Sequence, residues 1–251
     1  MSVLEMISVA LAGVFAGTIN TVVGSGTLVS FPVLLAVGYP PVIANISNGL
    51  GLVPGSVSGA FGYRRELAGQ RGRLLRLGAL SVCGGVSGAV LLLVLPPEAF
   101  EAVVPFLIVI ALMLVILQPW VAKRLAARRG ARHVHGGVLM LVAVFLIGMY
   151  GGYFGAAQGV LLLAVMGMLM DEHLQRINGA KNVLAALTNL GSGLVFVFVA
   201  DVAWLAVALL AGGAILGGLL GALIGRRLPP MVLRGVIVLV GIVAMVQLLL
   251  D

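Results

Sequence analysis

The stretch GVFAGTINTVVG at residues 13–24 recurs as GMYGGYFGAAQG at residues 148–159, with the same spacing of glycines. The repeat continues downstream, where NGLGLVPGSVSG (residues 48–59) corresponds to NVLAALTNLGSG (residues 182–193). Each half therefore predicts an apolar helix, a glycine-rich break, a short apolar piece and a helix with asparagine near its start. In membrane proteins, segments broken at corresponding places in two halves point to the binding site of a transporter.

The composition places the chain in a membrane. Hydrophobic residues make up 61% and charged residues 9% of the 251 residues, which leaves too little polar surface for a water-soluble globule. Runs such as residues 103–121 and 205–225 match the roughly 20 apolar residues that a helix needs to cross the hydrocarbon core. The first run starts near Val3 without a basic leader, so we expect a retained helix rather than a cleaved signal peptide.

Ten apolar segments are predicted, eight of full length and two of half length. They cover residues 3–23, 27–37, 42–62, 77–95, 99–121, 137–154, 159–170, 177–199, 202–225 and 231–250. The half-length pieces, 27–37 and 159–170, follow the glycine breaks, and a helix of about 11 residues reaches only about 16 Å. Because open backbone at a break cannot face lipid, both pieces must lie among other helices or line a cavity that contains water. The fold class is therefore an all-α integral membrane protein.

The positive charges decide between two topologies. If the short pieces only dip into the membrane, the basic loops divide between its two sides. If each short piece contributes to a change of side, all basic loops share one side, and the other side receives Glu5, Glu98, Glu101, Asp201 and Asp251. The second arrangement obeys the positive-inside rule. Its five passes per half also invert the second repeat relative to the first, as in many secondary transporters.

We therefore predict two inverted repeats, residues 1–122 and 137–251, joined by a basic cytoplasmic linker at residues 123–136, with both termini periplasmic. The linker faces anionic lipid headgroups, so the net charge of +7 reflects orientation and predicts no nucleic-acid partner. The histidines lack the spacing of a metal site, and the single Cys83 excludes a cysteine cluster, so no metal or cofactor is expected. The oligomeric state stays open, and a homodimer is one of the states to test.

The residues that could bind a substrate are a set of polar residues and glycines within the apolar repeats. Lys181 stands out, since an ammonium in an apolar helix is costly unless it snorkels, pairs or meets water. It either reaches the cytoplasmic boundary near Asp171 and Glu172 or supplies positive charge to an anion pathway. The glycine-rich breaks at residues 24–27 and 155–159, before the two short helices, would also point unpaired N–H groups at an anion.

These considerations divide the polar residues and glycines into two groups. The asparagines either bind the anion or tie helices together by hydrogen bonds. The candidate substrate-binding residues are Asn20, Gly24, Ser25, Gly26, Asn48, Gln158, Gly159, Lys181, Asn182 and Asn189. Close helix packing is the expected role of Gly13, Gly17, Gly148 and Gly152.

The order and double occurrence of these motifs resemble the sulfite exporter TauE/SafE family of bacterial permeases, also called the TSUP family. The resemblance runs from VVGSGTLVSFPVLLAVG and ANISNGLGLVPGSVSGAFGYRREL to GMYGGYFGAAQGVLLLAVMGMLM and NGAKNVLAALTNLGSG. It implies transport of small sulfur-containing anions, such as sulfite or the organosulfonate sulfoacetate, across a bacterial inner membrane. We expect alternating access with the anion between the breaks. An anion channel or facilitator with the same polar lining stays open, whereas the sequence offers no catalytic group for an enzyme.

Overall fold

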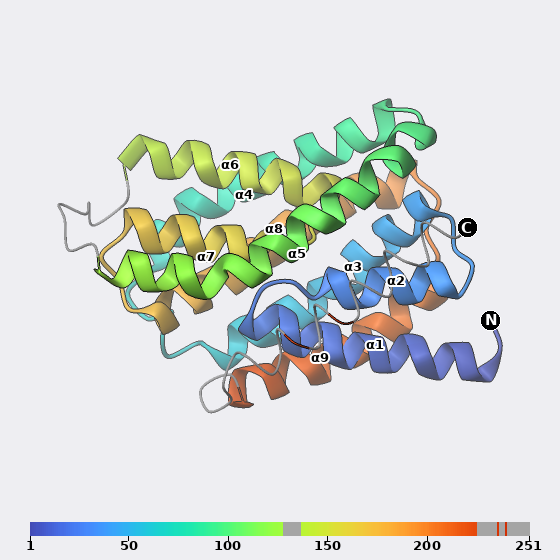
Figure 1. Ribbon diagram of the computed structural model, residues 1–251, viewed down its shortest axis with the longest axis horizontal. Helices are drawn as coiled ribbons and strands as arrows, with labels where there is room; N and C mark the ends of the chain where they lie inside the picture. Colours follow the sequence, from blue (N-terminus) through green and yellow to red (C-terminus); the bar gives the residue numbers. More distant parts are fainter. Residues whose placement is uncertain (128–136, 225–234, 236–238, 240–251) are drawn as a thin grey trace.

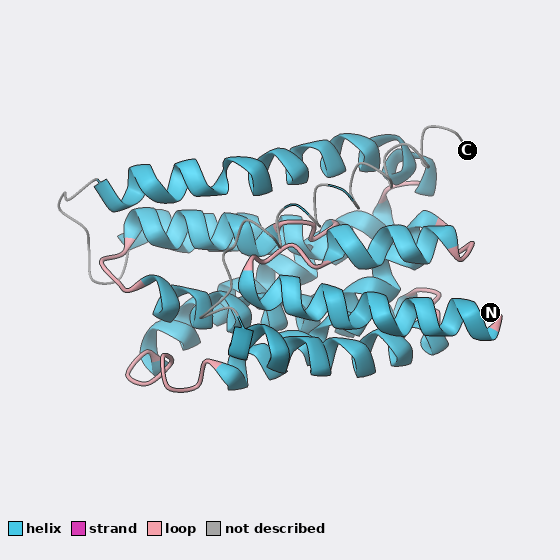
Figure 2. Ribbon diagram, turned by 60° about the horizontal axis from the view of Figure 1, so that its bottom comes forward, coloured by secondary structure: helices cyan, strands magenta, loops and turns pink. Residues whose placement is uncertain are grey.

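The computed structural model describes residues 1–127 and 137–224, together with residues 235 and 239. In this part of the chain the regular secondary structure is all α-helical, which confirms the predicted class. The helices are α1 (Val3–Val22), α2 (Thr27–Ala36), α3 (Pro41–Gly62), α4 (Arg71–Val94), α5 (Pro97–Ala127), α6 (Gly137–Tyr153), α7 (Gln158–Leu169), α8 (Leu174–Val199) and α9 (Trp204–Ile224). By length and composition, α1, α4, α5, α8 and α9 are able to cross a membrane. The chain is a multi-pass membrane protein. Its helices form a bundle in which their axes are roughly aligned (Figures 1 and 2).

Most helix ends agree with the predicted segments. α2 has 10 residues and α7 has 12, which confirms the two half-length helices. α4 starts at Arg71 and not at Leu77, because its first turns carry arginines that a search for apolar runs leaves out. α5 continues to Ala127, so the first residues of the predicted linker are helical. The rest of the linker and most of the predicted tenth segment lie outside the described residues.

Helices α1 and α6 end in the same way, at a glycine in the left-handed region. Gly24 has a φ of +91° and Gly155 a φ of +79°, values that residues with a side chain rarely adopt. The N–H of Gly24 donates to the Ile19 carbonyl, and that of Gly155 donates to the Tyr150 carbonyl, each at 3.1 Å. The two breaks therefore correspond at Gly24 and Gly155. The glycine spacing in the sequence pairs Gly24 with Gly159 instead, and the structure corrects that alignment by four residues.

Contacts between helices recur in the two halves. α1 packs against α9, where a Cβ on Gly217 would lie 2.1 Å from the Val14 carbonyl oxygen. α6 packs against α4, where a Cβ on Gly84 would lie 2.3 Å from the Phe145 carbonyl oxygen. The first helix of each half thus lies against the fourth helix of the other half, so the halves are interlocked.

The third and fourth helices repeat a second pair of contacts. A Cβ on Gly218 of α9 would lie 2.3 Å from the Gly55 carbonyl oxygen of α3. A Cβ on Gly85 of α4 would lie 2.4 Å from the Thr188 carbonyl oxygen of α8. Gly55 of α3 therefore corresponds to Thr188 of α8, 133 residues later. The motifs that start at Asn48 and Asn182 suggest an offset of 134 residues instead.

The glycines assigned to packing have that role. A Cβ on Gly17 would lie 2.5 Å from the Ala214 carbonyl oxygen, and one on Gly152 would lie 2.1 Å from the Gly85 carbonyl oxygen. Gly13 and Gly148 face α9 and α4 in the same way. The helix backbones come this close because no side chain separates them, as is common between membrane helices.

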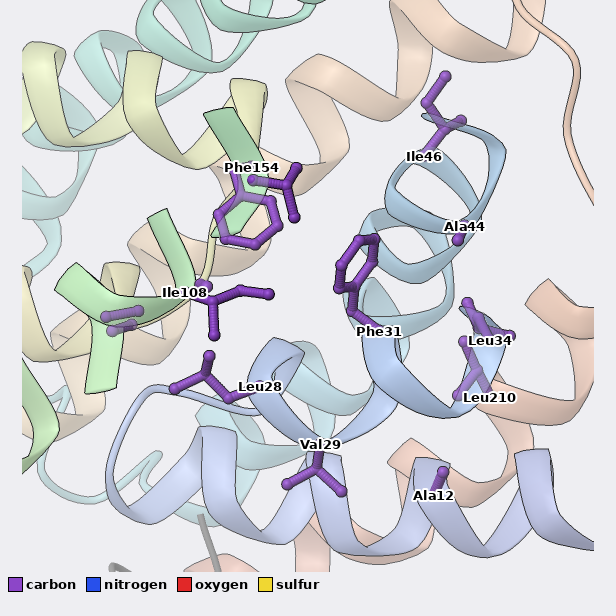
Figure 3. Close-up of a cluster of buried hydrophobic side chains, with 14 of the residues drawn as sticks. Ala12, Leu28, Val29, Phe31, Leu34, Ala44, Ile46, Ile108, Phe154 and Leu210 are labelled. Carbon is purple, nitrogen blue, oxygen red and sulfur yellow. The ribbon is translucent and has the colours of Figure 1, made fainter. Parts of the chain in front are cut away.

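A cluster of apolar side chains packs beside the second break. Phe154, within this break, meets Phe31 of α2 edge to face, with ring centroids 5.5 Å apart. Figure 3 shows these rings beside Leu28 of α2 and Ile108 of α5. All four side chains are buried. A short helix of the first half is therefore anchored on the break of the second half by contacts that exclude water.

The arginines of the described residues gather at one end of the bundle. In Figure 1, the N-terminus shares one end with the α2–α3, α4–α5 and α8–α9 connections, and the α3–α4 and α7–α8 connections lie at the other end. Among the described residues, every arginine lies at or near this second end: Arg64, Arg65, Arg71, Arg73, Arg76, Arg124 near the end of α5, and Arg176. α3 starts at the first end and α8 at the second, so the two run in opposite directions, as an inverted repeat requires. The complete inverted repeat of five segments stays a prediction.

Cysteine accessibility tests the orientation. With Cys83 replaced by Ala, we expect Ser2→Cys and Asp201→Cys to react with a membrane-impermeant thiol reagent added to spheroplasts. Arg65→Cys should react only after lysis, because the arginine-rich end should be cytoplasmic. All three positions are exposed. The reverse pattern would contradict the predicted periplasmic N-terminus.

Two adjacent glycines of α9 provide a matched test of the packing. A Cβ on Gly213 would lie 2.1 Å from the Ala10 carbonyl oxygen, whereas a Cβ on Gly212 would have no atom within 4 Å. Gly213→Ala should lower the free energy of unfolding by about 1–3 kcal/mol, because backbone has to move. Gly212→Ala should leave it unchanged within about 0.5 kcal/mol. Thermal unfolding in detergent measures both, and equal effects would contradict the proposed packing.

Candidate functional site

The two helix breaks touch each other. The N–H of Gly159 donates to the Gly24 carbonyl at 3.0 Å. A Cβ on Gly24 would lie 2.5 Å from the Gly159 Cα, so both residues must lack a side chain for this contact. The two breaks, between which the anion is expected to bind, therefore lie against each other. The bundle thus brings together two backbone segments from opposite halves of the sequence.

The start of α7 is closed by this contact. Its first N–H groups all have acceptors within the protein: those of Gln158, Val160 and Leu161 bond to carbonyls of the break itself, and that of Gly159 bonds to Gly24. At the start of α2, Gly26 provides no side-chain cap, and a Cβ there would lie 2.4 Å from the Ala16 carbonyl oxygen. An anion could therefore reach the N–H of Gly159 only if the two breaks moved apart.

Lys181 lies beside the breaks and is 1% exposed. Its Nζ donates to the carbonyl oxygens of Asn20 at 2.8 Å and Thr21 at 2.9 Å, both in the last turn of α1. Its stem passes Gly159, where an added Cβ would lie 3.0 Å from the Lys181 Cδ. The reading of Lys181 as a residue that reaches the membrane boundary is therefore wrong. The lysine points inward.

The position of Lys181 follows from the end of α1. The last carbonyls of a helix have no partner within the helix and carry a partial negative charge. Lipid supplies no donor for them, so a side chain has to. Asn182 adds a weaker bond, with Nδ2 at 3.4 Å from the Thr21 oxygen. The second half of the chain thus caps the broken helix of the first.

The reverse cap is made by α3. Asn45 Nδ2 donates to the Tyr153 carbonyl at the end of α6, at 2.9 Å. With α3 and α8 aligned by their packing, Asn45 corresponds to Asn178, and Asn48 corresponds to Lys181 rather than to Asn182. Each half therefore caps the broken helix of the other half. The amide of Asn45 in α3 caps α6, and the amine of Lys181 in α8 caps α1.

The remaining candidate residues hold the breaks in place. Asn48 binds the start of α2: its Oδ1 accepts from Ser30, and its Nδ2 donates to Thr27 Oγ1 at 3.2 Å. Asn20 Nδ2 donates to Ser56 Oγ of α3 at 3.0 Å. Asn189 is the exception, because it is only half-buried and lies about 12 Å along α8 from Lys181.

Several buried polar atoms near the breaks have no hydrogen-bond partner among the described residues. They are Thr21 Oγ1, Ser25 Oγ, Gln158 Nε2, Asn178 Oδ1 and Asn182 Oδ1. An unsatisfied buried group costs about 1–3 kcal/mol. This concentration of costly atoms on α1, α8 and both breaks marks the region as a candidate binding site. Thr21 and Ser30 were not found from the sequence, since only the fold brings them to the breaks.

A second polar cluster lies at the arginine-rich end. Glu172 Oε2 accepts from Arg73 at 3.0 Å, and Glu172 Oε1 accepts from Arg176 at 2.7 Å. Burial alone would raise the pKa of the Glu172 carboxyl, but the hydrogen bonds and charges of the two arginines outweigh it and lower the pKa. Gln70 Nε2 also donates to the Arg176 carbonyl at 3.2 Å. The α3–α4 and α7–α8 connections are thereby tied together.

The fold and the site define a class of protein. Broken helices from two halves that meet beside buried polar side chains are the usual construction of secondary transporters. In the described part of the chain, no group of three His, Cys, Asp or Glu side chains is placed to hold a metal ion.

The chain belongs to the sulfite exporter TauE/SafE family, whose family model matches residues 9–248. It is 28% identical over 255 aligned residues to the probable membrane transporter protein YfcA of Escherichia coli K12, with 99% of this chain and 93% of that protein covered. It is 29% identical over 245 residues to the probable membrane transporter protein ORF9 of a Sinorhizobium species, with 96% and 91% covered. No solved structure matches the chain. The protein is a membrane transporter of this family.

The Glu172 cluster predicts a pH-dependent contribution to stability. Because its pKa is lowered in the folded protein, the contribution is present above the unfolded pKa of about 4.5 and is lost as pH falls through the folded value. Glu172→Gln should lower the free energy of unfolding by about 1 kcal/mol at neutral pH. The difference from the unmodified protein should shrink as the pH falls below 4.5 and Glu172 becomes protonated. Asp171→Asn, next to it and exposed, is the control, and an equal loss there would contradict the role of Glu172.

Proposed function

We propose that this protein is a secondary transporter of small sulfur-containing anions, sulfite or organosulfonates such as sulfoacetate, and that it works across the bacterial inner membrane by alternating access. The observation that carries the proposal is the contact between Gly24 and Gly159 beside the buried Lys181. The family to which the chain belongs supports the class of substrate.

An anion suits this site for two reasons. Lys181 is the one basic side chain buried among the described helices, and it lies where the two halves meet. The N–H of Gly159, at the start of α7, lies beside the lysine stem and becomes available when Gly24 withdraws. A helix start and an ammonium together favour an oxyanion over a neutral or cationic solute.

Alternating access has a structural basis in the interlocked halves. Each half caps the other half's broken helix, through Lys181 on one side and Asn45 on the other. Moving one half against the other would have to exchange these caps and separate the breaks. In the transport cycle we propose, the anion takes the place of Gly24 as the acceptor of the Gly159 N–H.

A ligand screen tests the substrate class. Sulfite, thiosulfate, sulfoacetate, taurine and sulfate are each added to the purified protein, with chloride as the control, and thermal unfolding is measured. A true substrate raises the unfolding temperature by mass action, because it binds the folded state. Anion counterflow in proteoliposomes then separates the two mechanisms, since a transporter saturates and exchanges whereas a channel conducts. No shift with any sulfur oxyanion would remove this substrate class.

Two variants of Lys181 test the site. Lys181→Gln keeps an N–H donor for the carbonyls of α1 but removes the charge, and should weaken anion binding by about ten- to a hundredfold, or roughly 1.5–3 kcal/mol. Lys181→Met removes the donor as well, so it should also lower the free energy of unfolding by about 1–3 kcal/mol. Titrations in detergent and thermal unfolding measure the two effects separately. Unchanged anion affinity in folded Lys181→Gln would place the anion elsewhere.

A further inference from the structure

The donors and acceptors around Lys181 match a neutral amine. The described residues give its Nζ two acceptors, the carbonyl oxygens of Asn20 and Thr21. A neutral amine has two N–H groups, whereas an ammonium has three. Both N–H groups of the neutral form are therefore satisfied by α1. A third N–H, present only after protonation, needs an acceptor from outside this set.

Among the described residues, no carboxylate bonds to Lys181. The elements packed against α8 are α1, α3, α4, α6 and α7. Their titratable or charged residues, with those flanking α3 and in α8 itself, are Glu5, Tyr63, Arg71, Arg73, Arg76, Cys83, Tyr150, Tyr153 and Arg176. None of these is a hydrogen-bond partner of the Lys181 Nζ. A buried, uncompensated ammonium is costly, so the charged form needs an anion to accompany it.

We propose that Lys181 is the proton-binding residue of the transport cycle and that the protein moves its anion together with a proton. This inference rests on the proposed anion transport. A proton from water adds to the lone pair of Nζ, and the third N–H formed in this way donates to an oxygen of the anion. When the anion leaves on the other side, the ammonium returns its proton to water there. Lys181 is then neutral, so the empty protein returns without a buried charge.

The location of Lys181 links protonation to the contact between the breaks. Its stem passes Gly159, the residue whose N–H bonds to Gly24. An anion held by the third N–H would therefore lie within reach of the Gly159 N–H as well. Neither donor is available in the empty, unprotonated protein: the first does not exist, and the second is occupied. Proton and anion binding would open the contact together, and a monovalent anion would cross with no net charge.

Proton uptake during anion binding is the direct test. The purified, unmodified protein is titrated with sulfoacetate or thiosulfate in weak buffer near pH 8.5, and a pH indicator reports protons taken up. Neither probe takes up a proton near this pH, and histidines are neutral there. We expect uptake of up to one proton per anion, and an affinity that falls by up to tenfold per pH unit as pH rises.

Two variants identify the residue that is protonated. Lys181→Gln, which cannot be protonated, should bind with no proton uptake and with an affinity independent of pH. His173→Gln removes an exposed histidine at the start of α8 and should behave like the unmodified protein. In proteoliposomes, acidification of the side that holds the anion should drive accumulation by the unmodified protein and by His173→Gln, but not by Lys181→Gln.

The outcomes separate this inference from the proposed function. Anion binding without proton uptake at any pH, or counterflow that ignores a pH gradient, would overturn proton coupling and leave anion transport intact. Proton uptake that persists in Lys181→Gln would assign the proton to another residue and also overturn the inference. If neither binding nor counterflow occurred with any sulfur oxyanion, the proposed function itself would fail.

Discussion

A helix that ends inside a membrane must have its last carbonyl groups satisfied by the protein, because lipid offers no donor. In this protein both α1 and α6 end in this way, and the rest of the site follows from that constraint. Lys181 reaches across from α8 to the end of α1, and Asn45 reaches across from α3 to the end of α6. The caps join opposite halves, so the end of each broken helix is completed by a residue of the other half.

Glycine makes this assembly possible at two levels. Gly24 and Gly155 end the helices because their backbone lies in the left-handed region. Glycines along α4 and α9, such as Gly84 and Gly217, let α6 and α1 approach to backbone contact. The same residue type thus serves chain reversal and packing, and the two roles cannot be told apart from spacing alone.

That double role explains what the sequence could and could not predict. The half-length helices α2 and α7 follow from apolar run length, and the packing of Gly17 and Gly152 follows from four-residue spacing. The glycine spacing aligned the two halves wrongly, because it pairs Gly24 with Gly159. In the structure Gly24 ends α1, whereas Gly159 lies in the first turn of α7. The partners of Lys181 could not be predicted, since the acceptors are backbone carbonyls, which every residue has. Only the fold shows which carbonyls lack a partner.

The two halves are alike in packing but not in charge, and that difference bears on mechanism. α3 and α8 correspond in their contacts, yet Asn48 occupies the position equivalent to Lys181. Asn48 is fully engaged with the start of α2 of its own half, whereas Lys181 bonds to α1 of the other half. In alternating access the two halves exchange their conformations. The amine of Lys181 can gain and lose a proton during this exchange, whereas the amide of Asn48 cannot. Lys181 would therefore bind the proton both when the site opens to one side of the membrane and when it opens to the other. When the anion is absent, the α1 carbonyls accept the N–H groups of the neutral amine and keep it in position.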